Sequence, residues 1–207
     1  MVAGSAASGA PLTFNVMPPE TAASVLQEVC TLISRGEKGS ASLLIQDRYP
    51  FAPQQRSERQ YTPRQMTSVF VRDGFIDRYR GTRLVFPATL RLISRLLPDE
   101  FPYHRNWKMT ECHVAYWELH PTIDHIHPVA RGGTDTNENW VSCSMLTNSI
   151  KSNWTLKQLG WRLQPPGDIH SWDGLLGWFV KQVEDDKTIL HEPYFKRWYS
   201  AALPHVA

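Results

Sequence analysis

Residues 121–153, PTIDHIHPVARGGTDTNENWVSCSMLTNSIKSN, hold most of the side chains in this protein that suggest chemistry. The first part, residues 123–129, has an extended pattern and lies between Pro121 and the Arg-Gly-Gly run at 131–133. Because glycine adopts the positive φ that a tight reversal needs, this pattern predicts one arm of a β-hairpin. A helix is expected from about residue 142. The stretch therefore predicts a hairpin followed directly by a helix.

The same residues resemble the HNH, or ββα-metal, endonuclease family, whose motif combines a strand, a glycine turn and a helix. The matching parts are Asp-His-Ile-His-Pro at 124–128, Gly-Gly at 132–133, Glu-Asn at 138–139 and Asn-Ser-Ile-Lys at 148–151. The steps also agree: fourteen positions from the first His to the paired Asn, nine to the helical Asn, and three to the Lys. The resemblance covers residues 118–155, about a fifth of the chain, and implies a metal-dependent nuclease.

Three of these side chains suit the hydrolysis of a phosphodiester. The reaction needs a base for water and a cation for the charge that develops on the phosphate. Histidine is the side chain that most readily exchanges a proton near neutral pH, so His125 is the expected general base. Asp124 and Asn148 offer the hard oxygen ligands that suit one Mg²⁺ or Mn²⁺ ion. Neighbours on an ideal strand face opposite ways, so Asp124 and His125 share a site only where the strand twists or bulges, as it does in the family.

Three further residues receive roles alongside these. The resemblance implies that Asn139 acts in catalysis indirectly, by holding the loop and thereby fixing His125. Lys151 lies one helical turn beyond Asn148, where we expect it to meet a substrate phosphate. Arg131 is also expected to bind substrate. Taken singly each residue is ordinary, so the prediction depends on their joint spacing.

One departure from the family concerns zinc. Many HNH proteins brace the motif with two Cys-x-x-Cys pairs, but Ser144 and Thr147 stand where the downstream pair would fall. The three cysteines, Cys30, Cys112 and Cys143, are far apart and odd in number, which argues against a disulfide framework and a four-cysteine zinc site. We therefore expect no structural zinc, and we expect packing by the flanking segments to hold the fold.

Composition is that of an ordinary folded domain. The chain has 207 residues with 42% apolar content, which is enough to bury a core. No stretch approaches the roughly 20 apolar residues that a membrane helix needs, and residues 1–11 lack the basic start of a signal peptide. We therefore expect a cytoplasmic protein that does not bind a membrane.

Positive charge is concentrated in one part of the chain. The net charge is only +2, but residues 35–108 carry 14 basic against 7 acidic side chains, whereas residues 109–207 carry 8 against 11. The basic segment is a candidate surface for nucleic-acid phosphates, with a scattered solvated surface as the alternative because it holds no dense basic run. We expect DNA as the partner, and the sequence leaves RNA and the oligomeric state open.

Helices are expected on both sides of the motif. Aromatic side chains in the C-terminal segment are expected to pack in the core rather than to stack on bases. His113 and His127, which lie outside the motif, are expected to be structural or exposed. Periodicity and helix-end signals predict helices over 20–34, 63–71, 87–97, 155–159, 171–190 and 194–203, a strand-like stretch over 74–86 and a loop over 49–63.

Together these segments predict an α+β protein in which a small ββα-metal HNH core is embedded in flanking helices. We expect a flexible N-terminal tail over residues 1–12 and a helical and strand flank over 13–108, which is the candidate nucleic-acid contact region. The HNH core is expected over 109–160 and a C-terminal helical flank over 161–207.

The expected function is endonuclease action on DNA, in which water activated by His125 attacks a phosphate bound to a divalent metal ion. The resemblance implies 5′-phosphate and 3′-hydroxyl ends. One alternative is a nucleic-acid-binding protein with a catalytically degenerate site, which the complete motif disfavours. The other is a nuclease toxin, which is disfavoured because neither an export signal nor the extra histidine ligand of such toxins is found.

Overall fold

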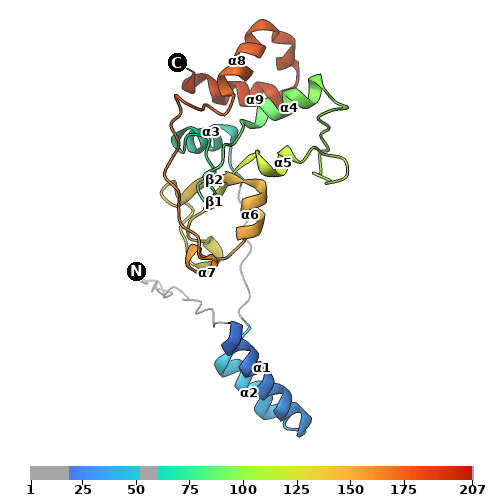
Figure 1. Ribbon diagram of the computed structural model, residues 1–207, viewed down its shortest axis with the longest axis vertical. Helices are drawn as coiled ribbons and strands as arrows, with labels where there is room; N and C mark the ends of the chain where they lie inside the picture. The colour runs from blue at the N-terminus through green and yellow to red at the C-terminus, as the bar shows by residue number, and fades with distance from the viewer. Residues whose placement is uncertain (1–18, 52–59, 207) are drawn as a thin grey trace, which may run out of the picture. The chain divides into compact units, whose positions relative to one another are not determined.

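The computed structural model describes residues 19–51 and 60–206 (Figure 1). Its contacts divide the chain into two units. The first ends at residue 57 and also takes in residues 130–132, and the second holds the remainder.

This division differs from the expected one. A flank running from residue 13 to residue 108 was predicted, but the boundary between the units falls inside it, after residue 57. The tail predicted over residues 1–12 lies outside the described residues, as do residues 52–59 of the predicted loop.

The first unit is built from two helices that lie side by side (Figure 1). α1 (Pro19–Ser34) confirms the helix predicted over 20–34, whereas α2 (Lys38–Arg48) was not predicted. Gly36, with φ of 79°, makes the turn between them. Arg48 and Glu28 form an exposed ion pair across the two helices at 2.8 Å. The buried contacts between the helices come from Val25, Val29 and Ala41.

The centre of the second unit is a hairpin followed by a helix. β1 (Pro121–His125) pairs antiparallel with β2 (Trp140–Ser144), so that the first residue of β1 lies opposite the last of β2. α6 (Met145–Lys151) begins directly after β2, where the Ser144 side chain caps it by accepting a hydrogen bond from the Thr147 amide. The predicted order is confirmed, although β1 ends earlier and the helix begins later than expected. The protein is of the mixed α+β class, as predicted.

A loop closes the free edge of β2. Asp73 Oδ2 accepts hydrogen bonds from the amide (2.7 Å) and the hydroxyl (3.1 Å) of Ser142. Asp77 Oδ2 accepts one from the Ser144 amide at 3.0 Å, and the Arg78 amide donates to the Ser142 carbonyl at 2.9 Å. A two-stranded sheet exposes unpaired backbone groups at its edges, and these contacts satisfy them. We call Asp73 and Asp77 the edge carboxylates.

The edge carboxylates are fully buried and have donors on every oxygen. Asp73 Oδ1 accepts hydrogen bonds from Arg72 and Arg78, each at 2.9 Å. Asp77 Oδ1 accepts from the amides two and three residues further along the chain, at 3.0 and 3.1 Å. A buried charge is costly unless it is paired and hydrogen-bonded. The hydrogen bonds to all four oxygens therefore allow the two carboxylates to be buried at the edge of the hairpin.

The strand predicted over residues 74–86 is wrong. In the described chain, the β-pairing of this segment is limited to an isolated bridge between Ile76 and Arg83. Positive φ angles at Gly74 (64°) and Phe75 (47°) turn the chain out of an extended conformation. Gly74 also lies so close to Gly167 that a Cβ atom would collide with the Gly167 carbonyl. The segment is shaped by these contacts rather than by its alternating pattern.

Four helices cover the other side of the second unit and form its main core (Figure 1). They are α3 (Pro63–Arg72), α4 (Pro87–Leu96), α8 (Leu176–Asp185) and α9 (Pro193–Ala202). The helices predicted over 63–71, 87–97 and 194–203 are confirmed, with Thr62 and Gln65 forming a capping box at α3. The prediction that the C-terminal aromatic side chains pack in the core holds for Phe179, Phe195 and Trp198, whereas Trp161 and Trp172 are only partly buried and Trp178 is exposed. The largest members of the main core are Phe70, Phe75, Phe86, Phe179, Phe195 and Trp198.

The helix predicted over residues 171–190 is shorter in the structure. Gly174 and Leu175 have φ of 67° and 61°, and Asp173 accepts hydrogen bonds from the amides of Leu175 and Gly177, so the helix begins only at Leu176.

In residues 19–51 and 60–206, no helix combines the length and apolar character needed to cross a bilayer. The short elements are α5 (Ala115–Glu118), α7 (Leu156–Leu159) and the 3₁₀ helices η1 (Val129–Arg131), η2 (Lys187–His191) and η3 (Leu203–His205).

Candidate active site

Three predicted site residues meet at one pocket of the second unit. The pocket has a volume of about 230 Å³, and Asp124, His125 and Asn148 all line it together with Tyr61, which lies just ahead of α3. Asp124 and His125 are adjacent in β1, yet both reach the pocket. They are the last two residues of the strand, where the regular alternation of a pleated strand stops.

Asp124 is anchored through one of its two carboxylate oxygens. Oδ2 accepts a hydrogen bond from the Tyr79 hydroxyl at 2.6 Å and lies 2.8 Å from Lys151 Nζ. Burial, reinforced by the negative charge of Asp124, raises the pKa of Tyr79 far above its ordinary value, so this hydroxyl remains a proton donor. Among the described residues, none donates a hydrogen bond to Oδ1. Oδ1 is therefore the atom of Asp124 available to a ligand.

Lys151 does not occupy the exposed position that contact with a phosphate requires. Its side chain is fully buried, and Nζ donates to the His125 carbonyl at 2.7 Å while pairing with Asp124 at 2.8 Å. Helical spacing correctly places Lys151 one turn beyond Asn148, but it does not reveal that this face of α6 packs against β1. The predicted substrate contact is corrected accordingly: Lys151 holds the end of β1 and neutralises Asp124.

A second hydrogen-bond network surrounds the His125 imidazole. Nε2 lies 2.8 Å from Asp135 Oδ1 and 3.4 Å from the Tyr61 hydroxyl. The same Asp135 oxygen accepts hydrogen bonds from the Tyr61 hydroxyl and from Trp140 Nε1, both at 2.8 Å. An ionised carboxylate only accepts, so in the neutral imidazole Nε2 carries the proton and Nδ1 is the basic nitrogen.

Asp135 stays ionised in this network although its side chain is only 40% exposed. Partial burial raises the pKa of Asp135, but the hydrogen bonds from His125, Tyr61 and Trp140 outweigh it and hold the pKa below its ordinary value. Sequence reasoning missed both Asp135 and Tyr61. An acidic residue ten positions after His125, directly beyond the glycine turn, was a usable signal for Asp135. Tyr61 is 64 positions away from His125, and no local pattern indicates it.

Asn139 bridges the loop that joins the two strands. Its Oδ1 accepts a hydrogen bond from the His127 amide at 2.9 Å, and its Nδ2 donates to the carbonyls of His127 (2.8 Å) and Thr134 (2.7 Å). Gly133 fits beneath this bridge only because it lacks a Cβ, which would collide with the His127 carbonyl. These contacts hold the loop in the way expected of Asn139, and its catalytic role stays a prediction.

Asn148 presents an amide to the pocket from α6. Its Nδ2 donates to the Thr122 hydroxyl at 2.9 Å, which fixes the orientation of the amide. A carboxylate oxygen without a described donor and an oriented amide oxygen, on the same pocket, are the donor types that Mg²⁺ or Mn²⁺ favours. In the described parts of the chain, no three His, Cys, Asp or Glu side chains are grouped to hold a metal ion. Asp124 and Asn148 are thus the candidate ligands, and the remaining positions would fall to water and substrate.

The other predicted residues lie apart from this arrangement. Arg131 is the last residue of η1 and falls with the first unit in the division of the chain, so its contact with substrate stays a prediction. His127 is exposed. His113 stacks on Phe101 at 4.3 Å and accepts a hydrogen bond from the Ala115 amide. The prediction that the histidines outside the motif are exposed or structural is confirmed.

Several arginines of the basic segment are engaged inside the fold. Arg72 donates to the carbonyls of Asn137 (2.8 Å) and Trp140 (2.6 Å), while Arg78 donates to the Gln164 carbonyl at 2.7 Å and to Asp73. Arg91 lies over the Tyr103 ring at 3.5 Å. The segment over 35–108 is therefore not one continuous surface for phosphates, because part of its charge is neutralised or buried.

Comparisons with protein-family models, with curated proteins and with solved structures found no match for this chain. The case for a function therefore depends on the motif and on the geometry of the pocket.

Proposed function

We propose that this protein is a metal-dependent endonuclease that hydrolyses phosphodiester bonds in DNA. The observation that carries the proposal is the joint placement of Asp124, His125 and Asn148 on one pocket, with Asp135 bound to the His125 imidazole. A pocket lined by a histidine that a carboxylate orients, and by two residues that carry oxygen donors, has the parts that phosphodiester hydrolysis needs.

In the proposed reaction, His125 Nδ1 takes a proton from water as the water oxygen bonds to phosphorus. The bond from phosphorus to the 3′ oxygen breaks, and that oxygen takes a proton from solvent, which leaves 5′-phosphate and 3′-hydroxyl ends. Asp135 orients the imidazole and stabilises the positive charge that it acquires. A Mg²⁺ or Mn²⁺ ion held by Asp124 and Asn148 would supply positive charge to the phosphate and the leaving oxygen.

One observation favours a second function, that of a nucleic-acid-binding protein with a degenerate site. Lys151 already neutralises Asp124 at 2.8 Å, and a neutralised carboxylate attracts a metal ion less strongly than a free one. Such a protein would bind DNA and leave it uncut with every divalent metal ion. The assay that tests the nuclease therefore also tests this alternative.

The test is cleavage of supercoiled plasmid by the full chain with Mg²⁺, with Mn²⁺ and with a chelator. We expect cleavage only with a metal ion, and we expect His125→Ala to lower the single-turnover rate by about 10² to 10⁴, the usual contribution of a positioned base. His170→Ala, at an exposed histidine outside the pocket, is the matched control and should cut at the wild-type rate.

Metal titration by calorimetry separates the two kinds of site residue. His125→Ala should bind Mn²⁺ as the wild type does, whereas Asn148→Ala should bind it more weakly and recover part of its rate at high Mn²⁺. Wild-type cutting by His125→Ala under metal saturation would overturn the mechanism. Binding of DNA without cleavage under any metal condition would establish the degenerate site instead.

A further inference from the structure

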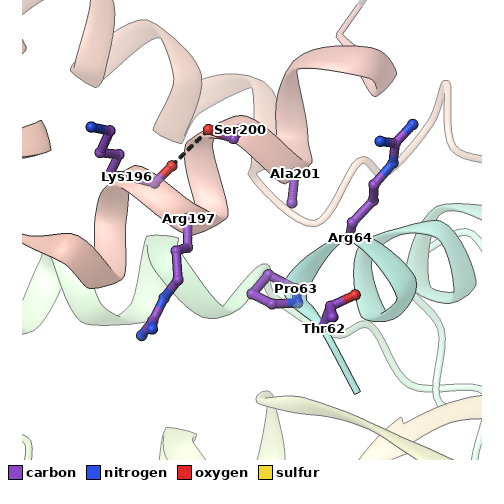
Figure 2. Close-up of a pocket in the computed structure, with 7 residues that line it drawn as sticks. All are labelled: Thr62, Pro63, Arg64, Lys196, Arg197, Ser200 and Ala201. Carbon is purple, nitrogen blue, oxygen red and sulfur yellow. Dashed lines mark hydrogen bonds between the residues drawn. The ribbon is translucent and has the colours of Figure 1, made fainter. Parts of the chain in front are cut away.

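A second pocket lies in the same unit, between the start of α3 and α9 (Figure 2). It has a volume of about 410 Å³, and the basic residues that line it are Arg64, Lys196 and Arg197. Thr62 and Ser200 contribute polar groups, and no acidic residue of the described chain lines it. We call Arg64, Lys196 and Arg197 the basic triad.

The basic triad is not neutralised by the rest of the described chain. None of its members forms an ion pair with a residue in 19–51 or 60–206, in contrast to Arg78, which pairs with Asp73, and Arg95, which pairs with Glu192. The polar neighbours are already engaged: the Thr62 side chain caps α3, and the Ser200 hydroxyl donates to the Lys196 carbonyl at 3.0 Å. The three positive charges of this pocket are therefore not offset by any acidic side chain of the described residues.

A neighbouring histidine is affected by this charge. Burial, followed by the positive charge of Arg64, lowers the pKa of His205 below its ordinary value. The Arg64 contribution shows that this positive charge acts on a neighbouring group, and a charge of that sign attracts an anion.

The pocket is close to the candidate active site along the chain. Thr62 and Arg64 follow Tyr61, whose hydroxyl lies 3.4 Å from His125 Nε2. Three residues of chain span at most about 11 Å, so the backbone at Arg64 lies within that distance of the backbone at Tyr61. The Arg64 end of the basic triad is thus within reach of a polymer whose phosphate occupies the active site.

The charged ends of the basic triad point in different directions (Figure 2). A site for one small anion would direct its cations toward a single point, whereas a nucleic-acid backbone presents phosphates at regular intervals. We propose that the basic triad binds the backbone phosphates of DNA that flank the phosphate being cut. This inference depends on the proposed function only for the identity of its partner.

Binding is measured separately from cleavage, by fluorescence anisotropy of a labelled DNA duplex with the full chain in chelator at several salt concentrations. The test variant carries Arg64→Gln, Lys196→Gln and Arg197→Gln. The matched control carries Arg105→Gln, Lys157→Gln and Lys181→Gln, which removes the same charge from exposed positions outside the pocket. Each phosphate contact contributes about 0.9 to the slope of log affinity against log salt, so the test variant should lose roughly 2 to 3 from this slope.

We expect the control to keep the wild-type slope within about one, and the test variant to bind DNA more than about tenfold more weakly at roughly 0.1 M salt. A variant with Arg64→Lys and Arg197→Lys should retain the wild-type slope, because a phosphate contact needs the charge.

Equal slopes for the test and control variants would overturn the inference. A change of slope with duplex RNA and none with DNA would overturn it as well. A change of slope in a protein that never cuts DNA would uphold this inference and reject the proposed nuclease. If the wild type cuts DNA and the test variant keeps the wild-type slope, this inference is rejected and the proposed nuclease is upheld.

Discussion

The carboxylates at the edge of β2 and those at the pocket differ in how many of their oxygens are already engaged. Every oxygen of Asp73 and Asp77 accepts at least one hydrogen bond, and both side chains are fully buried. Of the two that we call the pocket carboxylates, Asp124 lines the pocket and is engaged through Oδ2, whereas Asp135 contacts the pocket residue His125 and is engaged through Oδ1. No described residue donates to their second oxygens. The first pair holds the sheet, whereas the second pair retains the capacity to bind or to orient a reacting group.

This contrast arises from where the partners come from. The donors to the edge carboxylates are mainly backbone amides and arginines of the fold itself, so their geometry is set when the hairpin packs on its flank. The pocket carboxylates instead use side chains for anchoring, namely Tyr79 and Lys151 for Asp124, and Tyr61, Trp140 and His125 for Asp135. Substitutions at the two pairs should therefore change different properties.

Asp73→Asn should have a larger effect than Asp135→Asn or Tyr61→Phe, and it should act on stability. It leaves Arg78, whose side chain is 11% exposed, without its charge partner and removes an acceptor from the edge of β2. Breaking a buried pair from one side costs about 3 to 5 kcal/mol, so the free energy of unfolding in urea should fall by that amount.

Asp99→Asn is the control for this substitution, because Asp99 is exposed and should change stability by less than about 0.5 kcal/mol. If Asp73→Asn matched this control, the edge carboxylates would not hold the sheet, and the contrast with the pocket would fail.

Asp135→Asn should leave stability close to wild type and lower the rate of cleavage. It keeps the shape of the side chain but removes the charge that stabilises the protonated imidazole of His125. Because the Asp135 side chain is 40% exposed, water screens the interaction, and we expect kcat to fall by about 10- to 100-fold, less than for a buried triad aspartate. KM and the affinity for Mn²⁺ should be unchanged, whereas a general loss of structure would alter both.

The pH dependence of this effect has a defined sign. Burial raises the pKa of Asp135, but its hydrogen bonds hold the pKa below the ordinary value, so the carboxylate is ionised across the neutral range. The ratio of wild-type to Asp135→Asn rates should therefore stay above one from about pH 5 to pH 8, well above the ordinary aspartate pKa. It should approach one as the pH falls through the lowered pKa. If the ratio instead fell to one near neutral pH, the loss of rate in Asp135→Asn would have to come from a titrating group other than Asp135.

The sequence predicts much of what is local in this molecule. The order of hairpin and helix follows from the glycine turn at 132–133, and α3 follows from Thr62 and Pro63. α7 follows from Thr155 and the left-handed Gly160. Signals of this kind act over three or four residues, and few tertiary contacts override them.

What the sequence did not predict depends on contacts between distant residues. Asp73 meets Ser142 69 positions away, and Tyr61 meets Asp135 74 positions away, so neither pair leaves a local pattern. Lys151 shows the same limitation in another form, because helical spacing places it on a face without revealing whether that face is buried. The joint spacing of Asp124, His125 and Asn148 did predict a shared pocket, since a hairpin followed directly by a helix brings those positions together.

Tyr61→Phe should have the smallest effect, and it tests whether a single hydrogen bond to Asp135 contributes to the rate of cleavage. It removes the hydroxyl that donates to Asp135 Oδ1 at 2.8 Å but keeps the edge-to-face contact with Trp140, whose ring centroid lies 5.0 Å away. Asp135 retains its hydrogen bonds to Trp140 and His125. One hydrogen bond is worth about 0.5 to 1.5 kcal/mol, so single-turnover cleavage should slow by roughly 2- to 10-fold.

Tyr49→Phe, at an exposed tyrosine of the first unit, is the matched control and should cut at the wild-type rate. If Tyr61 acts through Asp135, adding Tyr61→Phe to Asp135→Asn should produce little further loss, because residues that act through one another are not additive. A Tyr61→Phe defect larger than that of Asp135→Asn would instead mean that the hydroxyl acts on the reacting groups directly. Its distance of 3.4 Å from His125 Nε2 makes that outcome physically accessible, and the double variant distinguishes the two.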